Sequence, residues 1–182
     1  MTAHDQRILD DTRRWLERAI IGLNLCPFAK AVHVKQQIRY VISEATTAEV
    51  GEGDLEMALL ELNDADPAQV DTTLLIFPQA FADFLDFNDF IHQADALVDI
   101  MGFRGKYQLA SFHPQYQFAG TAADDIENYT NRAPYPILHL IREASIERAV
   151  AAFPDASVIF ERNMETMRRI GLEGWQKLMS EG

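Results

Sequence analysis

The chain has 182 residues, of which 48% are hydrophobic and 24% are charged, a composition typical of a soluble globular protein. This length is enough to bury a sizeable core, and we expect residues 1–182 to form a single domain. Sixteen Lys and Arg residues against 28 Asp and Glu residues give a net charge of −12, which repels phosphate backbones and anionic membrane surfaces. The charge therefore argues against both nucleic acid and membranes as partners.

A single cysteine, Cys26, excludes an intramolecular disulfide and with it an extracellular disulfide framework. Residues 2–14 are polar and lack the apolar segment of a secretory signal. The most apolar early stretch, residues 19–34, is interrupted by Asn24 and Lys30 and is too short to span a bilayer. We therefore expect a cytoplasmic protein.

The first predicted element is an amphipathic helix over residues 5–23, where apolar side chains recur at helical spacing. Pro27 disfavours the α conformation at Cys26, so this helix should stop near Asn24 and a short new turn should begin at Pro27. In that arrangement Cys26 would be the N-cap of the second helix.

The middle of the chain alternates strand and helix patterns. The β-branched and aromatic run "IRYVI", residues 38–42, predicts a strand, and an apolar stripe over 55–62 predicts a helix. The apolar run 72–77 is typical of a buried central strand. A third helix is expected over 84–101 and a third strand over 107–112.

The last third begins with a long polar connection after residue 112. Pro134 is expected to open a helix that runs to about residue 152, followed by a fourth strand over 156–160 and a terminal helix over 164–175. The whole pattern favours an α/β fold with a small mixed or partly parallel sheet of about four strands packed with helices.

The long connection is the predicted functional region, because structureless segments of this length are uncommon in compact domains and are often functional. His113 should lie just beyond the carboxyl end of a strand, where ligands bind in open α/β sheets. On the helix expected from Pro134, His139 and Arg142 would share one face. The substrate-binding candidates are Asn128, Asn131, Arg132, His139 and Arg142.

Two arginines and two histidines gathered in a chain of charge −12 would favour a small anionic molecule as the ligand. In a catalytic version Cys26 is the nucleophile, because a thiol at a helix N-terminus has a lowered pKa. His113 or His139 would be its base, and Asn128 or Asn131 would orient that base. The alternative readings are a buried apolar Cys26, a hydrogen-bonded strand terminator in His113, and turn-forming roles for Asn128 and Asn131.

No metal and no cofactor are expected. The histidines show no short ligand spacing, although His113, His139 and a carboxylate could in principle converge. The glycines of "VGEGD", Gly51 and Gly53, lack both the Lys-Ser/Thr of a phosphate-binding loop and the third glycine of a dinucleotide fingerprint.

Three segments, "WLERAIIGLNLCPFA", "LASFHPQYQFAGT" and "DDIENYTNRAPYPILHLIRE", resemble a family of uncharacterised bacterial proteins known as domain of unknown function 1415. The resemblance covers nearly the whole chain and implies a compact bacterial cytoplasmic protein without an assigned chemistry. Similar sequences often read Ser-Pro-Tyr-Pro after the arginine, whereas Ala133 precedes Pro134 here. This difference argues against a hydroxyl nucleophile at that position.

The resulting hypothesis is an enzyme of hydrolase or transferase type that acts on a small anionic substrate in a pocket built by residues 113–143. The alternatives are a non-catalytic protein that binds a small anionic metabolite, and a purely structural role for the polar cluster.

Overall fold

The computed structural model describes residues 2–152 and 156–180, and its centre is one four-stranded mixed sheet. The strands are β1 (Ile38–Ile42), β2 (Thr72–Ile76), β3 (Tyr107–Phe112) and β4 (Ile137–Arg142), in the order β1-β2-β4-β3. β1 and β2 are parallel, and β4 is antiparallel to both β2 and β3. We call the edge at which β1, β2 and β3 end the carboxyl edge, and the opposite one the amino edge.

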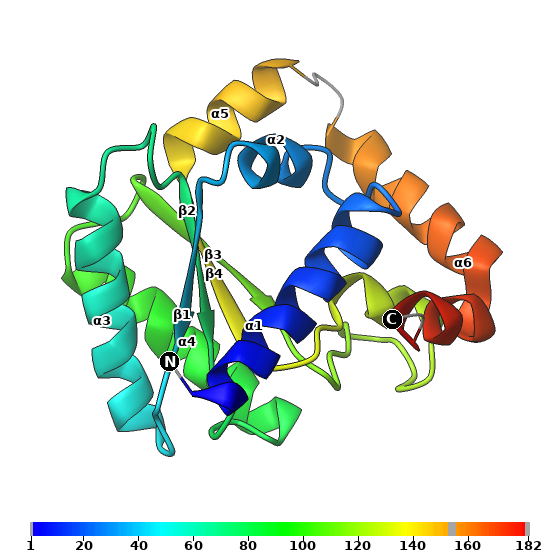
Figure 1. Ribbon diagram of the computed structural model, residues 1–182, viewed down its shortest axis with the longest axis horizontal. Coiled ribbons are helices and arrows are strands. Elements are labelled where there is room, and N and C mark those ends of the chain that lie inside the picture. Colours follow the sequence, from blue (N-terminus) through cyan, green and yellow to red (C-terminus); the bar gives the residue numbers. More distant parts are fainter. Residues whose placement is uncertain (1, 153–155, 181–182) are drawn as a thin grey trace.

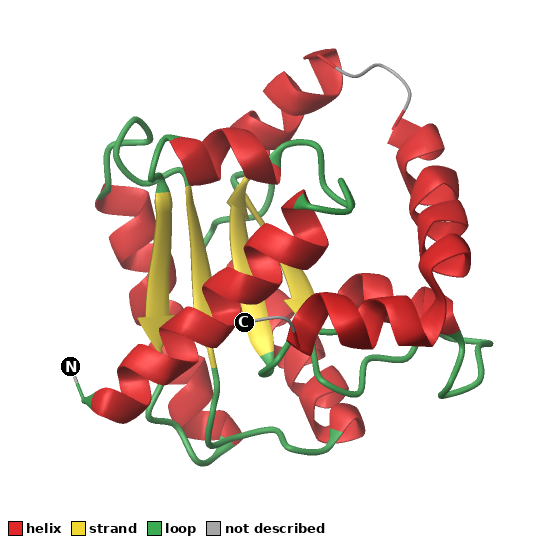
Figure 2. Cartoon of the chain, turned by 45° about the vertical axis from the view of Figure 1, so that its right-hand side comes forward, coloured by secondary structure: helices red, strands yellow, loops and turns green. Residues whose placement is uncertain are grey.

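Helices cover both faces of the sheet (Figures 1 and 2). One face carries α3 (Ala48–Asp64) and α4 (Phe84–Ile100), packed on Leu75, Leu138 and Leu140. The other face carries α1 (Ala3–Trp15), its π-helical continuation η1 (Leu16–Ile21) and α6 (Ala156–Ser180). Shorter elements are α2 (Ala29–Val34), the 3-10 helix η2 (Ile126–Asn131) and α5 (Glu143–Ala152). The α/β class expected from the sequence is confirmed.

Alternating orientation of side chains explains the two cores. On β2, Leu74 and Ile76 face α1 while Leu75 faces α3 and α4. Every residue of β2 is buried, as its continuous apolar run predicts for a central strand. Within the described ranges, none of the helices is long and apolar enough to cross a membrane.

Residues 134–152 do not form the single helix expected from the sequence. Residues 137–142 are the strand β4, which lies between β2 and β3, and only α5 is helical. The run "ILHLIR" is packed on both faces, so its apolar side chains do not alternate with polar ones and the strand period is hidden. As a result, His139 and Arg142 lie on a strand rather than on one face of a helix.

Residues 156–160, expected to be a strand, form the start of α6. The fourth position in the sheet is taken by β4, and Phe160 in this segment is 61% exposed. A short apolar run does not distinguish a strand from a helix by its pattern alone. The α6 segment changes direction at Gly171, whose φ of 63° is left-handed.

The second helix also begins later than expected. α2 starts at Ala29, and its N-cap is Phe28, which makes no side-chain capping bond. Cys26 therefore lies in the turn before α2 and not at its N-cap. The thiol therefore does not occupy the helix N-terminus that the proposed thiol mechanism requires.

Candidate functional site

The structure places five of the predicted site residues at two opposite ends of the sheet. His113, Asn128, Asn131 and Arg132 belong to the connection after β3, at the carboxyl edge. Arg142 ends β4 at the amino edge, where it pairs with Tyr107 at the start of β3. Since β4 positions 137 and 142 are five residues apart, these regions are separated by about 17 Å along the sheet. A single pocket that contains all of these residues is not formed.

His113 is almost fully buried and both of its ring nitrogens are used. Nδ1 accepts the backbone N–H of Gln115 at 2.9 Å, so the proton lies on Nε2, which donates to the carbonyl of Phe81 at 2.8 Å. The ring packs between Phe84 and Phe87 of α4. Burial lowers the pKa of His113, against the opposing effect of the Phe81 carbonyl. This histidine is therefore held neutral, as a link between two loops.

Asn128 organises the long connection from inside. It is fully buried, and its Oδ1 accepts both the backbone N–H of Phe118 and the hydroxyl of Thr121, each at 2.9 Å. Its Nδ2 donates to the carbonyl of Ala122 at 2.8 Å. One fully buried amide side chain thus bonds three groups of the loop.

We expect Asn128→Ala to lower the free energy of unfolding by about 2–3 kcal/mol, because the Phe118 N–H and the Ala122 carbonyl would lose their bonds to a fully buried side chain. Urea unfolding monitored by circular dichroism measures this loss. Gln117→Ala in the same loop is the control, since Gln117 is exposed and donates only to the carbonyl of Thr121, and it should change stability by less than about 0.5 kcal/mol. Equal losses for the two variants would contradict the role of Asn128.

Asn131 and Arg132 fasten the same connection to the rest of the fold. Asn131 donates through Nδ2 to the carbonyl of Ser111 at 3.1 Å. The backbone carbonyl of Asn131 accepts a hydrogen bond from the backbone N–H of His113. The Arg132 guanidinium lies 4.1 Å from the centre of the Tyr129 ring and donates to the carbonyls of Tyr116 and Ala123. These bonds satisfy loop carbonyls, which is the structural role that the sequence left open.

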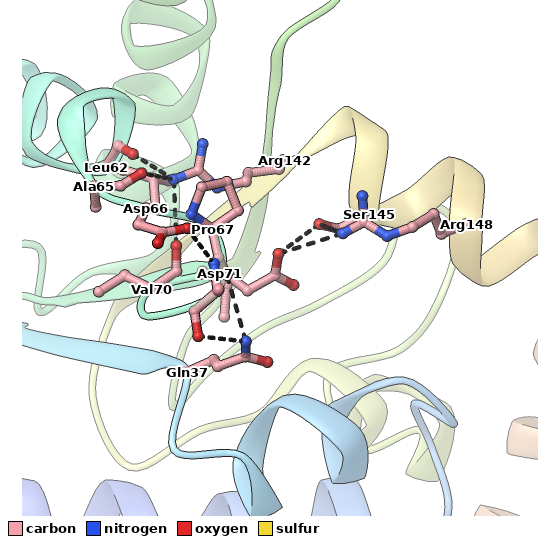
Figure 3. Close-up of polar contacts among 12 residues, drawn as sticks. Gln37, Leu62, Ala65, Asp66, Pro67, Val70, Asp71, Arg142, Ser145 and Arg148 are labelled. Atoms are coloured by element: carbon pink, nitrogen blue, oxygen red, sulfur yellow. Dashed lines mark hydrogen bonds and ion pairs between the residues drawn. The ribbon is translucent and has the colours of Figure 1, made fainter.

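Arg142 makes a different connection, at the amino edge. Its Nη2 donates to the carbonyls of Leu62, Ala65 and Val70 at 2.5, 3.0 and 3.2 Å, and its Nη1 donates to the Tyr107 hydroxyl at 3.2 Å. Figure 3 shows the guanidinium turned toward Leu62 and Ala65 at the end of α3 and toward Val70 in the loop before β2. The Arg142 residue is only 9% exposed. It closes the end of α3 and is not directed at a ligand.

A second polar group lies next to it in Figure 3. Asp71 accepts the hydroxyl of Ser145 at 2.7 Å and lies 3.6 Å from the guanidinium of Arg148. Gln37 donates to the carbonyl of Ala68 at 2.9 Å. These contacts fix the start of α5 and the loop before β2 to the amino edge of the sheet.

Cys26 and His113 lie on opposite sides of the sheet. Cys26 packs against the core under α1, whereas His113 packs against α4. The Cys-His pair considered from the sequence is thus not formed in this structure. Among the residues that the structure describes, no three His, Cys, Asp or Glu side chains come together as a metal site would require.

A concave site is present at the carboxyl edge, between the first turns of α3 and α4. It has a volume of about 310 Å³ and an apolar floor made by Phe81 and Phe90. Asp86 and Asp89 line one side from α4. The loops after the parallel strands β1 and β2 lead into this pocket, which is the usual position of ligand sites in open α/β sheets.

Phe81 in the pocket floor has a left-handed backbone, with φ of 59°. This conformation is rare for bulky residues and costs on the order of 1–3 kcal/mol. It is held by the bond from His113 to the Phe81 carbonyl and by a stacked contact with Phe90, with ring centres 4.4 Å apart. The buried histidine predicted as a catalytic group therefore supports the floor of this pocket from behind.

No pattern in the sequence indicates this pocket. Asp86 and Asp89 have the spacing of an ordinary solvated helix face, and no sequence pattern marks a phenylalanine for a left-handed conformation. The strand topology could have indicated it, because ligands in open α/β sheets bind in the crevice at the carboxyl ends of neighbouring parallel strands.

The fold and the site define an α/β protein with a small pocket at the carboxyl edge of a mixed sheet. A family model described as "Protein of unknown function (DUF1415)" matches residues 7–177, and the chain belongs to this family. Comparison with curated proteins and with solved structures found no significant match. The resemblance inferred from the sequence motifs is confirmed.

Proposed function

We propose that this protein binds a small cationic molecule with an apolar part in the pocket between α3 and α4. The observation that carries the proposal is the left-handed Phe81 in the pocket floor, held by His113. A strained backbone conformation of this kind persists only where the surrounding structure holds it in place, and such conformations cluster at ligand sites. Here it places an aromatic ring in the floor of a pocket of about 310 Å³.

The lining supports a cation rather than the small anionic molecule expected from the sequence. Asp86 and Asp89 are the charged residues of the lining, and both are exposed. The rings of Phe81 and Phe90 can contact an apolar group or the face of an ammonium. Arg132 and Arg142, the arginines expected to bind an anion, are instead bonded to backbone carbonyls.

Polar groups on the opposite side add directional contacts. Thr46 and Thr47 line the pocket beside the first turn of α3, and Gln93 lines it from α4. Hydroxyl and amide groups both donate and accept hydrogen bonds, so they suit the polar end of an amine or an amino alcohol. The proposed role is binding, and the pocket residues carry no catalytic assignment.

The test uses phenethylamine as probe and hydrocinnamate, the carboxylate of similar shape, as its control. Phenethylamine should bind with saturable chemical-shift changes at the amides of residues 80–93, whereas hydrocinnamate should bind more weakly by about fivefold or more because it faces two carboxylates. Equal binding of the two probes, or preference for the carboxylate, would overturn the proposal.

A matched pair of variants on α4 locates the site. Asp89→Lys should weaken phenethylamine binding by about fivefold or more, since it replaces an attractive charge in the pocket by a repulsive one. Asp95→Lys makes the same change of net charge on an exposed part of the same helix that does not line the pocket. If both variants weakened binding equally, the effect would be one of total charge and the pocket assignment would fail.

A further inference from the structure

The strand β1 is the outermost strand on one side of the sheet, and its outer side pairs with no other strand of the sheet. In the strand order it neighbours only β2, and all five of its residues are partly exposed, whereas all five residues of β2 are buried. Neither a proline nor a glycine interrupts β1, so nothing in its sequence prevents pairing with another strand. An edge of this kind presents unpaired backbone groups.

The hydrogen bonds at both ends of β1 show which groups these are. The carbonyl of Gln37 and the N–H of Ser43 both point to β2, the latter donating to Ile76 at 2.8 Å. In a parallel pair the residues of one strand alternate in direction, so Arg39 and Val41 also face β2. The N–H and carbonyl groups of Tyr40 and Ile42 therefore face away from the sheet.

A groove of about 240 Å³ runs between the end of β1 and α3. Its apolar lining includes Val41, Ala58 and Met57, and Met57 is 57% exposed although it is a large apolar side chain. A strand edge beside a helix is the arrangement in which extended peptides add a strand and place alternate side chains into the groove.

The charge of the groove identifies the kind of segment that fits. Glu44, Asp54 and Glu61 line it, and only Glu61 has an arginine partner, Arg39 at 3.2 Å. Asp54 accepts the hydroxyl of Ser43, which leaves its charge uncompensated. The groove is thus acidic on an apolar base, and it complements a segment in which basic and apolar side chains alternate.

We propose that β1 and α3 bind an extended basic segment of a partner protein, which pairs with the outward backbone groups of Tyr40 and Ile42. A second copy of this chain fits less well as the occupant. Its own β1 carries one basic side chain, Arg39, which already pairs with Glu61, so a second β1 does not supply the alternating basic residues that the groove complements. This inference is independent of the small-molecule pocket, which lies at the first turn of α3.

The experiment uses the full chain and a fluorescent nine-residue peptide of alternating lysine and valine, with blocked ends. Anisotropy should show saturable binding that weakens as salt is raised, and hydrogen exchange at the amides of Tyr40 and Ile42 should slow when the peptide is bound. The same peptide with every backbone nitrogen methylated keeps its charge but has no N–H group left with which to pair, and it should bind at least about tenfold more weakly.

Two charge variants complete the test. Glu44→Lys should weaken binding of the peptide by about fivefold, whereas Glu56→Lys, an equal charge change on α3 outside the groove, should leave it nearly unchanged. The proposal is overturned if the methylated peptide binds as well as its parent, or if the two variants have equal effects. Sedimentation that shows a dimer disrupted by Glu44→Lys would also overturn it, in favour of a second copy as the occupant.

Discussion

Replacing Arg142 by Met should lower the free energy of unfolding by about 3–4 kcal/mol, the largest loss that we expect from a single substitution in this chain. The guanidinium donates to three backbone carbonyls and to the Tyr107 hydroxyl, and all four would lose their donor. Methionine fills a similar volume, so the loss would report the polar contacts rather than a cavity. Urea unfolding monitored by circular dichroism measures it.

The reason for so large an effect lies in α3. This helix has no basic residue in its last turn, so the partial negative charge of its carboxyl end has no local partner. The Arg142 guanidinium, at the end of β4, supplies the positive charge and donates hydrogen bonds to the carbonyls of Leu62 and Ala65. A buried arginine without a carboxylate is stable here because a helix end acts as its counter-charge.

Two further variants separate charge from geometry at this position. Arg142→Lys keeps the charge but offers one compact donor group in place of the planar guanidinium, and it should recover about half of the loss. Arg148→Met removes an arginine from the same end of the sheet that is 66% exposed, and should cost less than about 1 kcal/mol. A loss below about 1 kcal/mol for Arg142→Met would show that Arg142 does not hold the end of α3.

The elements that were predicted correctly are those in which one physical signal dominates. The strands at 38–42, 72–76 and 107–112 and the helix at 84–100 follow apolar runs or stripes with clear breaks on either side. Residues 137–142 were assigned incorrectly, because burial on both sides of the sheet removes the alternation that marks a strand.

The site was predicted less well than the fold, for a related reason. The sequence placed His113 correctly at the carboxyl end of β3, but the chemistry of its neighbours is local: Asn128, Asn131 and Arg132 bond to the backbone of their own connection. The residue type alone does not show whether a polar side chain bonds to the backbone of its own loop or to a ligand. Only the hydrogen-bond partners, which depend on tertiary structure, separate them.

His139 should make the protein sensitive to mild acid. Its ring nitrogen Nε2 lies 2.6 Å from the hydroxyl of Thr72, and that hydroxyl donates its own proton to the carbonyl of Leu140 at 2.7 Å. Nε2 must therefore carry the proton in this bond, which fixes the neutral tautomer. Burial lowers the pKa of His139 to about 4, against a smaller opposing effect of Asp71.

The direction of the pH effect follows from this lowered pKa. In the unfolded chain the same histidine has a pKa of about 6.5, so between pH 6.5 and 4 the unfolded state binds a proton that the folded state does not. The stabilisation is complete above pH 6.5 and is lost as the pH falls toward 4. A shift of this size corresponds to about 3 kcal/mol, and because the side chain retains some access to solvent we expect about 2 kcal/mol.

We therefore expect His139→Gln to flatten the acid side of the stability profile. Glutamine can still donate to Thr72 but does not titrate, so between pH 7.5 and 4.5 the variant should lose about 2 kcal/mol less stability than the unsubstituted chain. Urea unfolding at a series of pH values measures the difference, and His92→Gln, on the exposed side of α4, should follow the original profile. If His139→Gln and the unsubstituted chain lose stability in parallel, the acid sensitivity comes from other groups, and the buried neutral state assigned to His139 is wrong.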